Sequence, residues 1–225
     1  MPWQPMPQAG TRAAPARIGF DAPIATMVIV VALFLTFPAH AQTTWSEIGD
    51  AGETIATAQL TVGPGPLLAI TGTLATDADV DIYCFRVQDQ PLFSLSLTNC
   101  LADTDPDLFL FNPGGFGLSH NDACALSSVT ISNTFVPGPG FYYVAIAGND
   151  ALAFAGASEI WLQASTGGER APDGPGAGLP YTSMGGPRVV VNNATYLITV
   201  SGSVFHDAAV SANPSSWARL KTIYR

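Results

Sequence analysis

The chain has 225 residues, of which 48% are hydrophobic and only 11% are charged, and its formal net charge is −9 at pH 7. Such an acidic chain repels phosphate backbones, so we do not expect nucleic acid as a partner. The same charge attracts divalent cations.

Residues 1–41 have the three parts of a cleavable secretory signal peptide. Arg12 and Arg17 supply the positive charge, residues 27–37 form an uncharged apolar run, and residues 39–41 (Ala-His-Ala) form a small-x-small cleavage site. The apolar run is shorter than the roughly 20 residues that a membrane-spanning helix needs. We therefore expect a secreted protein, extracellular or at the cell surface, without a transmembrane anchor after cleavage; the alternative is an uncleaved N-terminal anchor.

The mature chain, which would begin at Gln42 with a net charge of about −10, suits one domain over 42–210. Helical periodicity is nearly absent, and short apolar or alternating runs are separated by Gly, Pro, Asn and Asp. The predicted strands are 67–74, 80–87, 93–98, 108–112, 127–134, 141–147, 159–164 and 195–205. About eight strands with turns between them predict an all-β, jelly-roll-like β-sandwich.

The second predicted strand, 80–87, indicates which face lies inward. Successive side chains of a strand point to opposite faces. Tyr83, Phe85 and Val87 therefore share one face, which we predict to be the inner one.

Two segments do not fit the strand pattern. Residues 167–186 are rich in Gly and Pro, so they form either a functional loop or a mobile one, and the composition favours mobility. The C-terminal tail, 211–225, carries Trp217, Leu220 and Tyr224 at helical spacing. The tail is a short helix packed on the domain, a surface-sorting or docking tag, or a fraying end.

The mature chain contains three cysteines, Cys84, Cys100 and Cys124. Exported proteins meet an oxidising environment, so a disulfide is expected. We predict Cys100–Cys124 because both residues flank the same acidic loop region, whereas Cys84 lies in the middle of a predicted strand.

Catalytic motifs are absent from the sequence, and only His120 and His206 remain after signal removal. Ser119, His120 and Asp122 contain the residue types of a hydrolytic triad, but a triad is assembled in space and neighbours in sequence rarely meet in its geometry. We expect no enzyme, with His120 an exposed turn residue and His206 at the end of the last strand.

Acidic residues concentrate in turns. One group precedes and enters a predicted strand, and a second group spans two successive turns; they are Asp77, Asp79 and Asp81, and then Asp103, Asp105, Asp107, Asn121 and Asp122. Ca²⁺ takes six to eight oxygen ligands, and a cation relieves the repulsion between close carboxylates. The groups therefore predict bound Ca²⁺; the alternative is that these carboxylates only cap backbone N–H groups in turns.

Five stretches in chain order resemble the bacterial pre-peptidase C-terminal (PPC) domain family. The first is the opening segment, 45–59 (Trp-Ser-Glu-Ile-Gly-Asp-Ala-Gly-Glu, then Ala-Thr-Ala-Gln). The others contain the Asp-x-Asp-x-Tyr turn, the Asp-Leu-x-Leu-Phe strand, the Pro-Gly-x-Tyr-Tyr-Val strand and the closing strand; they are 70–85, 107–115, 139–146 and 194–202. The resemblance covers nearly the whole mature chain.

This resemblance implies a non-catalytic, jelly-roll-like β-sandwich of secreted bacterial proteins. Some relatives, among them clostridial collagen-binding modules, bind Ca²⁺ through the opening segment and the Asp-x-Asp-x-Tyr turn. Carried over, the ligands would be Glu47, Asp50, Asp79 and Asp81, with Ile48-Gly49 replacing the Pro-Asn that is common in the family.

The expected function is that of an exported, non-catalytic, calcium-stabilised β-sandwich module that binds an extracellular polymer or protein. The alternative is a structural cell-surface or matrix protein anchored through its C-terminal tail.

Overall fold

The computed structural model describes residues 43–97, 105–122, 128–163, 168–187 and 193–207. The predicted signal peptide, the C-terminal tail, Cys100 and Cys124 lie outside these residues, so the signal peptide and the Cys100–Cys124 disulfide stay predictions. Cys84 lies within them and is buried and unpaired. In the described part of the chain, no helix has the length and apolar character needed to cross a membrane.

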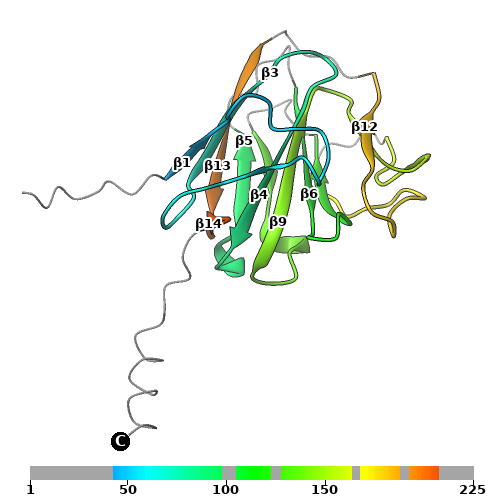
Figure 1. Cartoon of the computed structure of the whole chain (residues 1–225). Helices are drawn as coiled ribbons and strands as arrows, with labels where there is room; N and C mark the ends of the chain where they lie inside the picture. The colour runs from blue at the N-terminus through cyan, green and yellow to red at the C-terminus, as the bar shows by residue number, and fades with distance from the viewer. Residues whose placement is uncertain (1–42, 98–104, 123–127, 164–167, 188–192, 208–225) are drawn as a thin grey trace, which may run out of the picture. The chain divides into compact units, whose positions relative to one another are not determined.

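The described residues form an almost entirely β structure (Figure 1). Two short 3₁₀ helices occur, η3 (Gln90–Leu92) and η5 (Asn133–Phe135). The strands are β1 (Thr44–Ser46), β2 (Gln59–Leu60), β3 (Ala69–Leu74), β4 (Val80–Val87), β5 (Ser94–Leu97), β6 (Asp107–Phe111), β7 (Gly117–Asn121), β8 (Val129–Ile131), β9 (Gly140–Ala147), β10 (Leu152–Ala155), β11 (Ser158–Glu159), β12 (Ser183–Gly185), β13 (Ala194–Ser201) and β14 (Ser203–Phe205).

Most of the strands form two large sheets that face each other. The first has the order β1-β3-β13-β5-β8, and the second has the order β14-β4-β9-β6-β7. Without β1, β14 and β2, which also pairs with β4, four strands remain in each sheet. The first and last of these eight strands along the chain, β3 and β13, are neighbours in the first sheet. This is the strand order of a jelly roll, so the predicted β-sandwich is confirmed.

The main core lies between the two sheets. Tyr83, Phe85 and Val87 of β4 point into it and are fully buried, as their alternation predicts. The opposite face of β4 is also covered, because Val80 and Ile82 belong to a second apolar cluster. The strand is therefore buried on both faces, which explains its nearly continuous apolar sequence.

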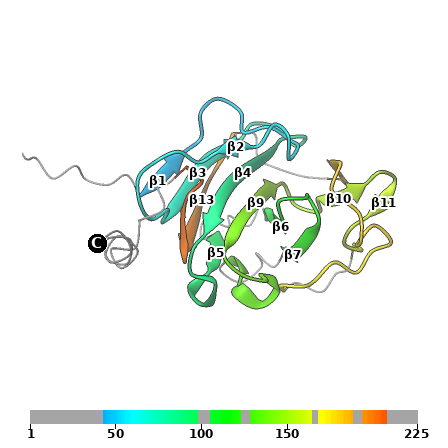
Figure 2. The same ribbon diagram turned by 60° about the horizontal axis from the view of Figure 1, so that its bottom comes forward.

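A third layer covers the outer face of the second sheet. Strands β11, β10 and β12 form a small sheet on the far side of β9, β6 and β7 from β13 and β3 (Figure 2). The predicted mobile segment, 167–186, belongs largely to this layer. Its backbone N–H groups at Gly174 and Gly176 donate to the carbonyls of Ile160 (3.0 Å) and Glu159 (2.8 Å), so this part of the segment is hydrogen-bonded to the end of β11 and the residue that follows it.

Two predictions at this layer are wrong. The predicted strand 159–164 shrinks to Ser158–Glu159, after which the chain bends and buries Trp161. His120 is not an exposed turn residue; it lies in strand β7, which the sequence did not indicate, and it is 4% exposed.

Candidate metal sites

The opening segment is fastened to the sandwich by Gln59. Its Oε1 accepts hydrogen bonds from Trp45 Nε1 (2.8 Å) and from the Ile48 backbone N–H (3.0 Å). Its Nε2 donates to the Ile48 carbonyl (2.9 Å). Trp45 is buried, and β1 pairs in parallel with β3. Residues 45–59 therefore form a loop at the edge of the first sheet, and the Gln59 side chain closes it.

Glu47 joins this loop to strand β3. Its Oε1 accepts from the Ala51 N–H (3.2 Å) and its Oε2 accepts from the Thr73 N–H (2.8 Å). Gly72 makes room for this arrangement, since a Cβ there would overlap the Glu47 carboxylate and the Tyr196 hydroxyl. Both Glu47 oxygens therefore serve the backbone, and Glu47 supports the nearby carboxylates.

The first cluster consists of Asp50, Asp79 and Asp81, which each offer one carboxylate oxygen within 4.8 Å of the others. Asp50 comes from the opening segment, Asp79 from the turn before β4, and Asp81 from β4 itself. Asp50 Oδ1 accepts from the Gly52 N–H (2.9 Å), and Asp79 Oδ2 accepts from the Ala75 N–H (2.5 Å). Two of the three side chains are thus oriented by the backbone of their own turns.

Asp81 is the buried member of the first cluster. Its Oδ2 accepts from the Tyr196 hydroxyl (2.6 Å), which also contacts the Tyr83 hydroxyl (2.5 Å). Its Oδ1 is buried and has no hydrogen-bond partner among the described residues. Burial raises the pKa of Asp81 to about 8, with smaller contributions from the charges of Glu47 and Asp79 and from a side-chain interaction with Glu47, even though the Tyr196 hydrogen bond opposes the shift.

The second cluster consists of Asp107, His120 and Asp122 on the outer face of the second sheet. Strands β6 and β7 are antiparallel, with Phe109 opposite His120. Because side chains alternate along both strands, Asp107, Phe109, His120 and Asp122 all point to the same side. That side lies under the third layer, beside Trp161.

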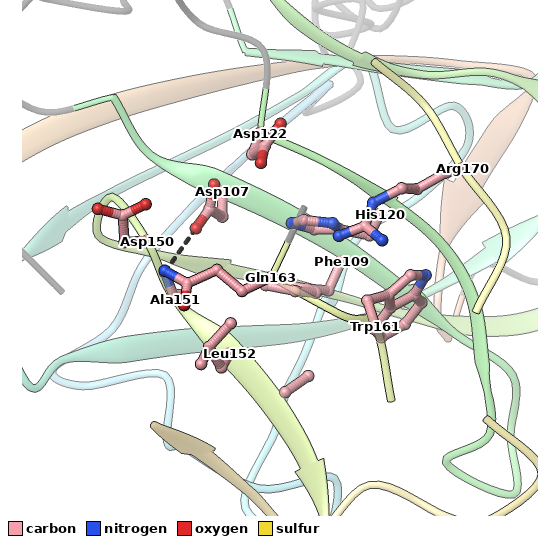
Figure 3. Close-up of a pocket in the computed structure, with 11 residues that line it drawn as sticks. Asp107, Phe109, His120, Asp122, Asp150, Ala151, Leu152, Trp161, Gln163 and Arg170 are labelled. Atoms are coloured by element: carbon pink, nitrogen blue, oxygen red, sulfur yellow. Dashed lines mark hydrogen bonds between the residues drawn. The ribbon is translucent and has the colours of Figure 1, made fainter. Parts of the chain in front are cut away.

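These side chains line a cavity of about 330 Å³ (Figure 3). Asp107 is 1% exposed; its Oδ2 accepts from the Ala151 N–H (2.7 Å), whereas its Oδ1 has no partner among the described residues. His120 stacks on Phe109 with ring centroids 4.3 Å apart, and neither of its ring nitrogens has a partner in the same part of the chain. The cavity thus holds buried donor and acceptor atoms that no described protein group satisfies.

Electrostatics in the cavity follow from burial. Desolvation raises the pKa of Asp107 well above its ordinary value, and it also raises the pKa of Asp122. Desolvation and then the charge of Arg170 lower the pKa of His120 to about 3, so its imidazole is neutral at neutral pH. Arg170 itself forms an ion pair with Asp173, in which its Nη1 donates to both carboxylate oxygens (2.8 Å each).

The structure groups the predicted ligands only in part. It brings together Asp50, Asp79 and Asp81, with Glu47 beside them as a backbone-bound support, while Asp77 is not in this group. In the second predicted group it brings together Asp107 and Asp122, but not Asp105. Asn121 points away, since its Nδ2 donates to the Thr130 carbonyl (2.6 Å), and Asp103 lies outside the described residues.

His120 is the ligand candidate that sequence reasoning missed. The sequence feature that could have revealed it is the His-x-Asp spacing of residues 120–122. If residues 117–121 form a strand, this spacing places the two side chains on the same face. Ser119 faces the other way, and its Oγ donates to Glu169 Oε1 (2.9 Å). Ser119 and His120 are therefore not arranged as members of a triad.

No protein-family model matches the chain, and no curated protein sequence matches it significantly.

Proposed function

We propose that the chain is an exported, non-catalytic β-sandwich module in which Ca²⁺ fixes the opening segment to the sandwich. The observation that carries this proposal is the convergence of Asp50, Asp79 and Asp81 from separate segments, with one buried oxygen of Asp81 left without a partner among the described residues. An ion there would bridge the opening segment and strand β4, while offsetting the repulsion among the three carboxylates. Water or backbone carbonyls would complete the six to eight oxygen ligands.

We further propose that the module binds an extracellular polymer or protein along the first sheet. A shallow groove of about 680 Å³ runs beside the first cluster over β1, β3 and β13. Its lining is rich in hydroxyl and amide groups, including Thr71, Thr73 and Asn193. An ion that orders the opening segment would also fix one wall of this groove, because Ser46, Glu47 and Gly49 belong to it.

Thermal unfolding tests the calcium proposal. Ca²⁺ at 100 times its Kd stabilises the fold by about 3 kcal/mol, which raises Tm by about 5–10 °C for a domain of this size. Asp79→Asn should abolish this rise, whereas Asp122→Asn in the second cluster should leave it unchanged. An equal Tm for the wild type in Ca²⁺ and in chelator contradicts the proposal.

Co-sedimentation tests the binding proposal. The wild type should sediment with at least one insoluble polysaccharide or fibrous protein in Ca²⁺, and less in chelator. Thr195→Arg places a bulky charge at an exposed position in the groove and should remove binding without a change in Tm. Binding that is unaffected by this substitution would place the ligand elsewhere on the molecule.

A further inference from the structure

We infer that Asp107, His120 and Asp122 form a second metal site, which takes a divalent transition-metal ion of the Zn²⁺ type. The site lies on the opposite face of the second sheet from the main core, whereas Asp81 of the first cluster lies on the core-facing side of β4, where it accepts from Tyr196 of β13. It shares no residue with the first cluster. The inference therefore stands independently of the calcium proposal.

Unpartnered buried atoms point to a missing ligand in the cavity. Asp107 Oδ1 and both ring nitrogens of His120 are buried without hydrogen-bond partners in the described part of the chain. Such atoms are rare in native proteins, because a buried polar atom that loses its hydrogen bonds to water without gaining a partner destabilises the folded state. A metal ion would bind Asp107 Oδ1 and one imidazole nitrogen, and the cavity has room for water at the other nitrogen.

The donor set selects the kind of metal. One imidazole nitrogen and two carboxylate oxygens suit Zn²⁺ and its neighbours, whereas Ca²⁺ prefers oxygen ligands alone. The three candidate atoms lie within 4.8 Å of one another. Ligands of a tetrahedral ion with bonds of about 2.0–2.1 Å lie about 3.3 Å apart, so small side-chain rotations close the site.

The surrounding structure holds the ligands in place. The Ala151 N–H orients the Asp107 carboxylate, and the Phe109 ring fixes the plane of the His120 imidazole. The His120 backbone is held by two hydrogen bonds to Arg170 (3.0 and 2.9 Å). Supporting contacts of this kind orient metal ligands and strengthen binding.

One coordination position remains open toward the cavity. Three protein ligands leave a fourth position on a tetrahedral ion, and Gln163 and Arg170 line the space that it faces (Figure 3). Zn²⁺ sites with three protein ligands hold water or a small ligand at this position. The bound ion would therefore take water or a small ligand from the cavity at this position, although Asp107 and His120 are themselves buried.

Calorimetric titration of the purified chain without a histidine tag tests the inference, after treatment with chelator. We expect one equivalent of Zn²⁺ to bind, and Co²⁺ bound at the same site to show visible absorption of a low-coordinate nitrogen- and oxygen-ligated ion. His120→Gln and Asp122→Asn should each weaken Zn²⁺ binding at least tenfold. Asp122 is only half-buried, so Asp122→Asn should keep the fold, and its Tm in chelator should match that of the wild type.

Two controls separate this site from other sources of binding. His206→Gln removes the other histidine of the mature chain, and Asp79→Asn removes a carboxylate of the first cluster; both should bind Zn²⁺ like the wild type. Zn²⁺ affinity within twofold of the wild type in both His120→Gln and Asp122→Asn overturns the inference. Equal binding of Ca²⁺ and Zn²⁺ at this site overturns the assignment of the metal.

Discussion

Replacing Asp81 with asparagine should stabilise the ion-free protein, although it removes a proposed calcium ligand. Asp81 is fully buried, and burial raises its pKa from 3.8 to about 8. A raised pKa favours the protonated form in the folded state, so this contribution to stability is complete below pH 3.8 and is lost as pH rises toward 8. Between pH 3.8 and pH 7 the free energy of unfolding of the wild type therefore falls by about 4 kcal/mol, at about 1.36 kcal/mol for each pH unit.

The Asp81→Asn variant has no such dependence on pH, and its amide oxygen can still accept from the Tyr196 hydroxyl. In urea denaturation with chelator, the free energy of unfolding of the variant should exceed that of the wild type by a margin that grows from near zero at about pH 4 to a few kcal/mol at about pH 7. With Ca²⁺ present, the wild type should gain stability and the variant should not. Asp89→Asn, at an exposed position, is the control and should show little change at any pH. A variant that is less stable than the wild type at neutral pH without Ca²⁺ refutes this reasoning.

Two further substitutions test the packing around the clusters. Gly117→Ala places a Cβ 2.5 Å from Trp161 Cη2 and should lower the free energy of unfolding by about 1–3 kcal/mol in urea, whereas Gly138→Ala, with nothing within 4 Å, should leave it unchanged. Tyr196→Phe removes the hydroxyl between Asp81 and Tyr83 and should cost about 1–3 kcal/mol by the same measurement; an unchanged stability would show that this buried hydrogen-bond pair contributes nothing.

Strong local patterns predicted the core of the fold. Strand β4 was predicted at its observed bounds, Val80–Val87, because most of its residues are apolar and polar residues follow it. Strand β9 was predicted to within one residue for the same reason. These strands are central in the second sheet, where burial on both faces leaves little ambiguity in the sequence.

The third layer was hidden because its order comes from contacts distant in the chain. Residues 168–187 have the composition of a mobile loop, yet their glycines let the backbone approach the carbonyl of Glu159, where a Cβ would collide. Strand β7 has the polar sequence Gly-Leu-Ser-His-Asn, and only its pairing with β6 identifies it as a strand. Amino-acid composition indicates only the local structural preference of a segment. In residues 168–187 and in β7, pairing with distant segments determines the structure instead.

The two clusters differ in how far the sequence could predict them. Asp79 and Asp81 stand two residues apart at a strand start, and the family resemblance added Asp50, so the amino-acid sequence was enough to propose the first cluster. The second cluster depends on the register between β6 and β7, which places Asp107 and Asp122 at the same end of the hairpin. Register cannot be read from either strand alone.

The short strands at the ends of the described domain have a consequence for aggregation. Strand β1 covers the edge of β3, and β2 and β14 both pair with the edge of β4 that faces away from β9, so backbone groups that an eight-stranded jelly roll would leave exposed are paired. Exposed strand edges are templates for pairing with other molecules. Residues near both ends of the domain thus shield one edge of each sheet, at β3 and at β4, from edge-to-edge self-association.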